Sequence, residues 1–565
     1  MTFQVSPGVN VSEIDNTTSI APVSTAIGAF VGAFRWGPVE DITTVDSEAD
    51  LVRNFGSPNA AASVDFHTAA YFLKYSRDLR VVRAEKDAFS ANTGGAADLL
   101  IKNDEEYDSA TLVFANHGHF IARHPGALGN SLKVSVFGFK TDTSTTATNF
   151  SSWAYSSNFD GPVGTSAYAT RFGSSNDEIH VAVIDEDGMF TGIKGSILEV
   201  FPYLSQASDG RAEDGASTYY ADVINATSEY IRFGAADSTN FANAGDAATG
   251  AVDYAVTPSN GTVDASLTGG DDGAALTPTE YLAGWDLFAD PDTIEVSLLI
   301  APSLSTNTSD ADTVADDLIA TAEARKDCVA FISPARGLDV EGIIAFADGL
   351  QSSSYAFVDS GRLKVYDKYN DTYINIPACS SIAGLTAETD RTVGSWYSPA
   401  GLRRGQLRGV TKLYLNPSKT DRDALYKRGV NPVVTFPGEG TLLFGDKTKL
   451  GRPSAFDRIN VRRLFITLEK AISRASRSNL FEFNDVFTRA EFVNLVEPFL
   501  RTVQGRRGII EFKVQADEFN NTGDVIDRNE FVGDIYIKPA RSINYIQLNF
   551  IATRTGVAFN EITGG

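Results

Sequence analysis

Residues 293–358 alternate between apolar strands and amphipathic helices, and this order constrains the fold more than any other feature of the sequence. The pattern predicts three strands and two helices in the order 293–301, 309–325, 328–333, 340–350 and 355–358. Strands that alternate with helices form parallel sheets with right-handed crossovers. We therefore expect an α/β domain at the centre of the chain.

The chain is too long to form a single hydrophobic core. Its 565 residues suggest three or four domains at ~150 residues each, because a single core rarely grows beyond ~300 residues. Residues 95–270 are rich in Ser, Thr, Asn, Gly and Asp and contain short alternating runs, which predicts a β-rich, water-facing insertion. The predicted division is an N-terminal arm (1–24), a core segment (25–94), inserted β-rich modules (95–270), the α/β domain (271–430), a C-terminal core domain (431–541) and a C-terminal arm (542–565).

Charge is distributed unevenly along the chain. The formal net charge is −24, which argues against a nucleic-acid binder with a broad basic surface. Residues 401–565 carry 26 Lys and Arg against 18 Asp and Glu, whereas residues 1–400 carry 22 against 54. Such asymmetry predicts two surfaces with different partners.

No pattern indicates targeting, a membrane span or a disulfide framework. Residues 1–7 lack the basic and apolar regions of a signal peptide, and the longest small-apolar stretch, Thr25 to Phe34, is shorter than the ~20 residues of a membrane span. Two cysteines provide no disulfide framework. We expect a soluble chain that folds in the cytoplasm and does not insert into membranes.

Candidate catalytic, metal and cofactor sites are weak. His117, His119 and His124 lie close together, but no Cys or closely spaced carboxylate completes a metal site, so we expect solvated surface histidines. Residues 293–430 contain no histidine, which a Ser-His-Asp triad requires. Residues 440–448 resemble a phosphate-binding loop, but Asp446 stands where the motif needs Lys, so we expect a turn between strands. The expectation is no catalytic, metal or cofactor site.

Two helices are predicted near the C-terminus. In the first, residues 460–478, apolar residues form one stripe and Arg463, Lys470, Arg474 and Arg477 form the opposite one. This basic stripe is either a solvated helix face or a surface that docks onto an acidic partner. The second helix is expected to begin at Thr488 with a capping box to Glu491, and to kink or end at Pro498.

Both ends of the chain carry a strand pattern with no local partner. Val9, Val11 and Glu13 alternate with polar residues near the start, and Ile546, Leu548 and Phe550 alternate within the predicted strand 543–552. A lone strand must pair elsewhere to satisfy its N–H and C=O groups.

Short phrases in this order resemble the tail sheath proteins of contractile-tailed, myovirus-type bacteriophages. Examples are GSWYSPAG at 394–401, LFGDKT at 443–448, INVRRL at 459–464 and DIYIKP at 534–539. Further matching phrases occupy residues 124–130, 267–273, 366–371, 383–384, 389–390, 404–405, 431–432, 481–484 and 517–521. The resemblance covers the N-terminal arm and most of residues 293–565, whereas residues 140–262 carry little of it.

The resemblance implies a structural subunit that stacks in hexameric rings around a tail tube and contracts to drive the tube through the host envelope. It implies an α/β domain with a subtilisin-like fold but no protease activity, formed together with N- and C-terminal segments of the chain and carrying inserted β-rich surface domains. It also implies arms that add strands to the sheets of neighbouring copies. The basic helix 460–478 would face the tube, and baseplate and tail terminator proteins would be further partners. The protein would be part of the virion and assemble in the host cytoplasm. With no nucleotide site, contraction would draw on a metastable extended lattice.

Three alternatives stay open from the sequence. The first is the sheath of a related contractile injection system such as a tailocin. The second is a self-assembling surface or adhesion protein, and the third is an envelope hydrolase.

Overall fold

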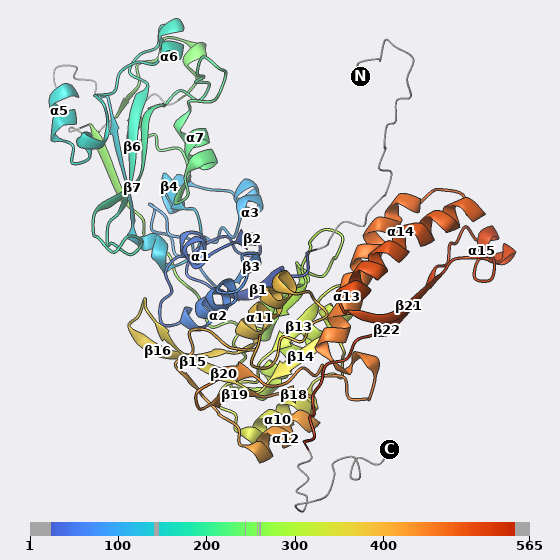
Figure 1. The fold of residues 1–565 in the computed structure, drawn as a ribbon. Coiled ribbons are helices and arrows are strands. Elements are labelled where there is room, and N and C mark those ends of the chain that lie inside the picture. The colour runs from blue at the N-terminus through green and yellow to red at the C-terminus, as the bar shows by residue number, and fades with distance from the viewer. Residues whose placement is uncertain (1–23, 140–145, 243–244, 257, 259–260, 549–565) are drawn as a thin grey trace, which may run out of the picture.

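A computed structural model describes the chain apart from residues 1–23, 140–145, 243–244, 257, 259–260 and 549–565. Figure 1 shows three regions: a central α/β body, a β-rich module that rises from one side, and a C-terminal projection built around two long helices. The multidomain α/β plus β architecture predicted from the sequence is therefore present. The residue boundaries proposed for the segments stay a prediction.

The central body contains a seven-stranded sheet with the order β18-β14-β13-β12-β1-β3-β2. All neighbours are parallel except β2 and β3. The strands are β1 (Gly28–Ala33), β2 (Ile42–Val45), β3 (Leu79–Ala84), β12 (Leu298–Ile300), β13 (Val329–Ile332), β14 (Ala356–Asp359) and β18 (Val430–Asn431). The helices α9 (Thr308–Arg325) and α10 (Val340–Gly349) connect β12 to β13 and β13 to β14. The predicted alternation between residues 293 and 358 is confirmed.

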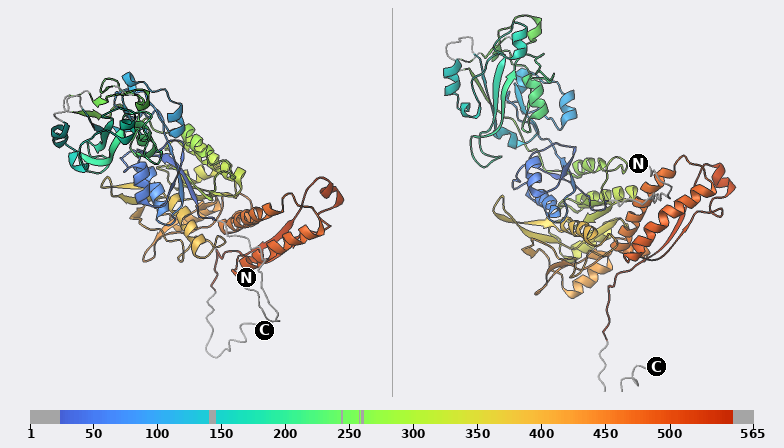
Figure 2. Two further views of the ribbon diagram at one scale, coloured as in Figure 1. Left: turned by 90° about the horizontal axis from the view of Figure 1, so that it is seen from above. Right: turned by 45° about the horizontal axis from the view of Figure 1, so that its top comes forward.

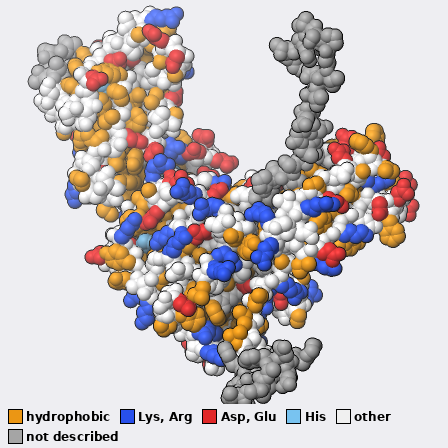
Figure 3. All heavy atoms as spheres, in the orientation of Figure 1, with side chains coloured by type: hydrophobic (Ala, Val, Ile, Leu, Met, Phe, Trp, Pro, Cys, Tyr) orange, Lys and Arg blue, Asp and Glu red, His pale blue; other side chains and the backbone are white. Residues whose placement is uncertain are grey.

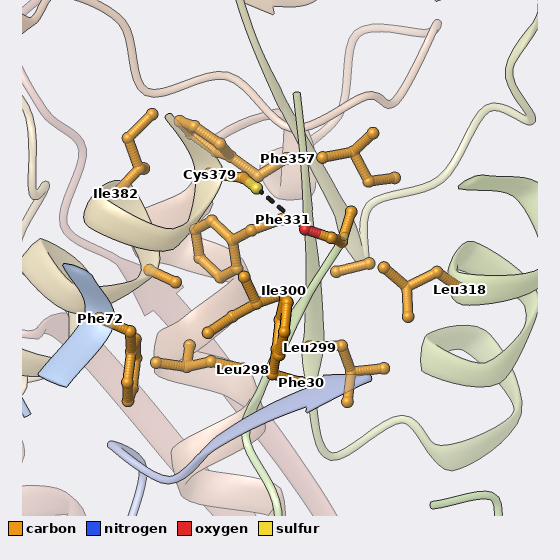
Figure 4. Packing of buried hydrophobic residues seen from close by; sticks show 14 of the residues in the cluster. Phe30, Phe72, Leu298, Leu299, Ile300, Leu318, Phe331, Phe357, Cys379 and Ile382 are labelled. Carbon is orange, nitrogen blue, oxygen red and sulfur yellow. Dashed lines mark hydrogen bonds between the residues drawn. The ribbon is translucent and has the colours of Figure 1, made fainter. Parts of the chain in front are cut away.

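Helices cover both faces of this sheet, and Figure 2 shows the layers from two further directions. The helices α2 (Ser63–Leu73) and α11 (Cys379–Thr392) pack together against one face, whereas α8 (Pro278–Asp286) and α9 pack against the other. In Figure 4, Phe72 and Ile382 lie on one side of the strands and Leu318 lies on the other. Burial of each such side chain contributes about 1.5–3 kcal/mol.

Smaller elements complete the body around the sheet. They are α1 (Glu48–Phe55), α12 (Lys419–Lys427), the three-stranded sheet of β15 (Arg362–Asp367), β16 (Thr372–Pro377) and β17 (Lys412–Leu413), and the hairpin of β19 (Val433–Phe436) and β20 (Gly440–Leu443). The residues that resemble a phosphate-binding loop form β20 and the loop after it. No helix begins there, although a phosphate-binding loop requires one.

The inserted module is built on a four-stranded antiparallel sheet with the order β11-β5-β6-β7. Its strands are β4 (Phe120–Ala122), β5 (Leu132–Gly138), β6 (Glu178–Asp185), β7 (Ser196–Ser205), β8 (Ile231–Phe233), β9 (Phe241–Ala242), β10 (Ala255–Val256) and β11 (Thr262–Ser266). Its helices are α3 (Asp104–Ser109), α4 (Phe114–His117), α5 (Thr146–Ser152), α6 (Ala167–Arg171) and α7 (Tyr220–Thr227).

The expectation of solvated histidines is wrong for His119, and a further histidine of this module, His180, is buried as well. His119 is 4% exposed, and its ring stacks on the rings of Phe241 and Tyr220 at centroid distances of 4.6 and 5.4 Å. His180 is fully buried, and its Nε2 lies 2.8 Å from the carbonyl oxygen of Gly161. Both imidazoles are parts of aromatic clusters, because a neutral imidazole packs against aromatic rings much as another aromatic ring does.

The C-terminal projection consists of α13 (Ile459–Ser476), α14 (Val486–Gly505) and the hairpin of β21 (Ile509–Gln515) and β22 (Asp534–Pro539), with the short α15 (Gly523–Asp527) between the strands. Leu468 and Ile472 of α13 share a core with Val496 and Leu500 of α14. The predicted start of α14 is wrong. Asp485 caps it by accepting a hydrogen bond from the Thr488 N–H at 2.9 Å, so the helix begins at Val486, and it continues through Pro498.

Among the described residues, no helix combines the length and hydrophobicity needed to cross a bilayer.

The inserted module should lose stability in acid because of His119. Burial lowers the pKa of His119 to about 4, although the Asp237 charge and a hydrogen bond to the Ala235 carbonyl oppose this shift. The unfolded chain takes up this proton at about pH 6.5, so stability is full above that pH and falls as the pH drops toward 4. The loss is about 3 kcal/mol. Urea unfolding between pH 7 and 4 should show it, and His119→Phe should flatten the dependence. An unchanged pH profile in this variant would contradict the assignment.

Candidate assembly surfaces

The helix α13 places the four predicted basic residues along its length, but they do not form one free surface. Arg463 is 4% exposed. The Lys470 side chain is 10% exposed, whereas those of Arg474 and Arg477 are 50% and 67% exposed. The prediction that Arg463 belongs to an exposed basic stripe is therefore wrong. Its position looks outward on a helical projection, but the α/β body covers that part of the helix.

Arg463 joins three segments that are far apart in the sequence. Its guanidinium forms an ion pair with Asp390 of α11, with Nη1 2.9 Å from Oδ1, and its Nη2 donates to the Thr25 carbonyl at 2.7 Å. The Thr25 hydroxyl also donates to Asp390, at 2.7 Å. Thr25 directly follows the N-terminal arm. The root of that arm is therefore fixed to both the body and the C-terminal projection.

The other three basic residues pair with the acidic segment that precedes β12. Lys470 Nζ and Arg474 Nη2 each lie 3.1 Å from Glu295 Oε1, and Arg477 Nη2 lies 2.9 Å from Asp292 Oδ1. Partial burial acts to raise the pKa of Glu295, but the hydrogen bonds and charges of Lys470 and Arg474 outweigh it and hold this pKa below its ordinary value. The basic residues of α13 therefore already form ion pairs with acidic residues in the body of the same chain.

The hairpin of β21 and β22 has two unpaired edges. The described residues form no further strand beside it, so the outward N–H and C=O groups of both strands lack sheet partners there. One side of the hairpin packs against α14, whereas Ile510 and Tyr536 are 65% and 56% exposed. An edge of this kind is a template for strands from another chain.

The chain after β22 forms no regular strand as far as the structure describes it. Residues 540–548 form no strand with other described residues, although Ile546 and Leu548 are 78% and 71% exposed. The predicted strand 543–552 is therefore absent up to residue 548. The remaining predicted arm residues, Val9, Val11, Glu13 and Phe550, lie outside the described residues.

Asp446 fixes the root of this C-terminal segment. It accepts hydrogen bonds from the Ser542 hydroxyl at 2.8 Å and from the Asn544 amide at 2.9 Å. The side chain of Asp446 is nearly buried and also receives the Tyr426 hydroxyl at 3.3 Å. In the sequence, Asp446 served only to reject a phosphate-binding loop and as part of the phrase at 443–448, and no local pattern pointed to a residue 96 positions away.

A buried serine lies beside a carboxylate at the carboxyl ends of the parallel strands, which is an arrangement that a hydrolase site also contains. The Ser333 hydroxyl donates to Asp359 Oδ2 at 2.7 Å, and the Cys379 N–H donates to Ser333 Oγ at 2.9 Å. Burial raises the pKa of Asp359 to about 7. All three residues are buried, so this cluster is a closed polar network within the core rather than an open site. Among the described residues, no group of His, Cys, Asp and Glu side chains could hold a metal ion.

The unpaired strand edges, the exposed apolar side chains of the C-terminal segment and the anchored arm roots are typical of one class of protein, namely a subunit that assembles with other chains. The family model for the phage tail sheath protein central domain matches residues 274–449, and the model for the phage tail sheath C-terminal domain matches residues 452–553. The chain is 32% identical to the tail sheath protein of Vibrio phage KVP40, with 99% of this chain and all of the relative covered. It is 31% identical to the tail sheath protein of Enterobacteria phage T4, with 99% of both chains covered.

The chain therefore belongs to the tail sheath protein family, and it is a structural subunit of a contractile phage tail sheath. Its fold is similar to that of the anti-feeding prophage helical sheath solved in the contracted state. The TM-score is 0.51 at 14% identity, with 98% of this chain and 100% of that chain covered.

Reversal of the Arg463 charge should unfold the junction between arm, body and projection. Arg463→Glu leaves Asp390 and the new carboxylate buried side by side, and loss of a buried partner costs about 3–5 kcal/mol. Arg477→Glu is the matched control, because its partner Asp292 is exposed and such pairs contribute roughly 0–1 kcal/mol. Urea unfolding followed by circular dichroism measures both. Equal midpoints for the two variants would show that the Arg463 pair has no structural role.

Proposed function

We propose that this subunit polymerises into stacked hexameric rings around a tail tube, and that contraction of the polymer drives the tube through the host cell envelope. One observation carries the proposal: the C-terminal projection exposes unpaired strand edges, and the segment after β22 carries exposed apolar side chains without forming a strand of its own as far as residue 548. The full-length relatives named above are both tail sheath proteins. The role is structural rather than catalytic, and the protein works as part of the virion after assembly in the host cytoplasm.

Strand addition between copies supplies the mechanism. The arms of neighbouring copies, with Val9, Val11 and Glu13 on one and Ile546, Leu548 and Phe550 on the other, extend the sheet of β21 and β22. Main-chain hydrogen bonds provide the affinity in such strand addition. A heterologous contact of this kind builds a helical polymer when its rotation does not close. The bodies can then move as rigid units while the strands continue to tether them, which allows the polymer to shorten without coming apart.

The α/β body acts as a rigid, non-catalytic block with a subtilisin-like fold. The absence of histidine from residues 293–430 supports this proposal, because a serine hydrolase needs a proton shuttle beside its nucleophile. The buried Ser333 likewise has no open space for a substrate.

The solvent side of α13 faces the tube. Arg474 and Arg477 extend from the exposed part of this face, while Lys470 and Arg463 attach the helix to the body behind it. Tail tube, baseplate and tail terminator proteins are the partners in this arrangement, with no nucleic acid involved.

Removal of main-chain donors from the C-terminal segment should prevent polymerisation. Ile546→Pro with Leu548→Pro deletes two N–H groups that point the same way along a strand. Each lost hydrogen bond costs about 0.5–1.5 kcal/mol, so the loss of two should raise the concentration needed to polymerise at least about fivefold. The control, Ile546→Ala with Leu548→Ala, keeps both donors. Sedimentation and electron microscopy of the purified protein measure the outcome, and normal tubes from the proline variant would refute strand addition here.

Charge reversal at the outer end of α13 should weaken attachment to tubes while leaving tubeless polymers intact. Arg474→Glu with Arg477→Glu should reduce co-sedimentation with tail tubes about tenfold, since rim charges govern the association of complementary surfaces. Lys194→Glu reverses another exposed, paired cation, which lies in the inserted module, and serves as the control. If both variants attached to tubes equally well, the result would show that α13 is not part of the tube interface.

A further inference from the structure

The free end of the C-terminal projection carries large apolar side chains that other described residues leave uncovered. Six of them are between 61% and 105% exposed, and they lie in the turn before α14, at the start of α14 and in the loop after β21: Leu480, Phe481, Phe483, Val486, Phe487 and Phe519. The Asn484 amide ties the two segments together by donating to the side-chain oxygen of Asn521 and to the Glu530 carbonyl, at 3.2 and 2.8 Å. We call these segments, residues 480–487 and 517–531, the tip.

A cluster of exposed phenylalanines on a folded domain indicates a binding surface. The tip is also acidic, because residues 480–487 contain two carboxylates and no cation, and residues 517–531 contain five carboxylates and one cation. Figure 3 shows hydrophobic and acidic side chains together at this end of the molecule. The partner surface should therefore combine apolar or aromatic groups with positive charge.

The opposite end of the same projection offers such a surface. A cleft of about 1020 Å3 lies where α14 ends, between the projection and the body. Its apolar lining includes Trp396, Tyr397, Tyr426, Phe444, Ile510 and Tyr545. Phe444 and Ile510 are 50% and 65% exposed, so the lining is open to a partner.

The cleft is also basic. Five cations line it, Arg404, Lys419, Arg422, Arg507 and Arg541, against the carboxylates Asp423 and Asp446. None of the five cations forms an ion pair within the part of the chain that the structure describes. Asp446 is already engaged by Ser542 and Asn544. The cleft thus has unmatched positive charge around aromatic walls, which complements the tip.

One molecule cannot use its own tip to fill its own cleft. Val486 at the start of α14 belongs to the tip, whereas Gln504 near its end lines the cleft. A helix of 20 residues is about 30 Å long. The complementary surfaces are therefore held apart at the two ends of a rigid element.

We propose that the cleft receives the aromatic, acidic tip of a second copy of this chain. The inference rests on the proposed polymerisation and adds a side-chain contact to the strand addition described above. A contact between two different surfaces of identical chains is heterologous, so it repeats from copy to copy as a ring or helix requires. The phenylalanines anchor in the cleft, and the charges at its rim select the orientation.

A charge-swap experiment with the full chain tests the contact. The tip variant carries Glu482→Lys and Glu518→Lys, and the cleft variant carries Lys419→Glu and Arg541→Glu. All four positions are exposed, and no ion pair involves them among the described residues, so both variants should fold. Each variant alone should need about tenfold more protein to polymerise. An equimolar mixture should polymerise like the wild type, because each reversed tip meets a reversed cleft.

Cross-linking provides a second, independent measurement. Both native cysteines, Cys328 and Cys379, are buried, so engineered thiols are the reactive ones. A polymer mixed from Phe483→Cys and Ile510→Cys copies should give cross-linked dimers with a short bismaleimide. The control pair, Phe483→Cys with Ile193→Cys, should not, because Ile193 is an exposed residue of the inserted module.

The outcomes separate this contact from the proposed function. Normal polymers from each charge variant alone, or a mixture that fails to recover, would overturn the contact while polymerisation of the wild type stands. A tip variant that fails only when tail tubes are present would assign the tip to the tube and overturn the contact as well. Failure of the wild type to polymerise would instead reject the proposed function.

Discussion

The parallel pairing of β1 with β12 is the interaction on which the rest of the structure depends. It joins Gly28 to Leu298 across 270 positions of sequence, and β3 pairs on the other side of β1. Because β3 and β12 both pair with β1, the residues that connect β3 to β12 in the sequence must leave the sheet after β3 and return to it at β12. The β-rich module is therefore an insertion between β3 and β12, and both of these strands pair with β1. The N-terminal arm leaves the core just before β1, so this pairing also fixes where the arm begins.

Two carboxylates then determine how the ends of the chain leave the molecule. Asp390 holds Thr25 at the root of the N-terminal arm together with Arg463 of α13, and Asp446 holds Ser542 and Asn544 at the root of the C-terminal segment. An arm that tethers a neighbouring copy transmits force to its own body through its root. A buried, charge-assisted attachment suits that task because loss of one partner leaves an unpaired charge in the interior. Under the strand addition proposed above, the arms would pair with neighbouring copies without loosening the subunit that carries them.

The basic helix shows where sequence reasoning succeeded and where it stopped. The apolar stripe that contains Leu468 and Ile472 predicted an amphipathic helix, and α13 buries those residues. The opposite stripe was treated as one surface, yet Arg463 is buried against Asp390 while Arg477 is exposed. Helical periodicity reports which residues share a face, but it does not report how far a neighbouring domain extends along that face. For the same reason the sequence pointed to the arms as strands without partners. It did not show that residues 480–487 and 517–531 meet in one tip, nor that a cleft forms, because the walls of the cleft come from seven separate stretches of the chain.

The sequence by itself determined the alternation of strands and helices, the division of charge and the family, because each depends on local periodicity, composition or ordered short phrases. Tertiary structure alone decided that β1 pairs between β3 and β12, that Asp446 anchors a segment 96 residues away, and that His119 and His180 are buried. The physical reason is the same in each case. Partners that are distant in sequence are determined by packing and by the need to give buried polar groups hydrogen bonds. Neither of these requirements produces a periodic pattern among residues that are adjacent in sequence.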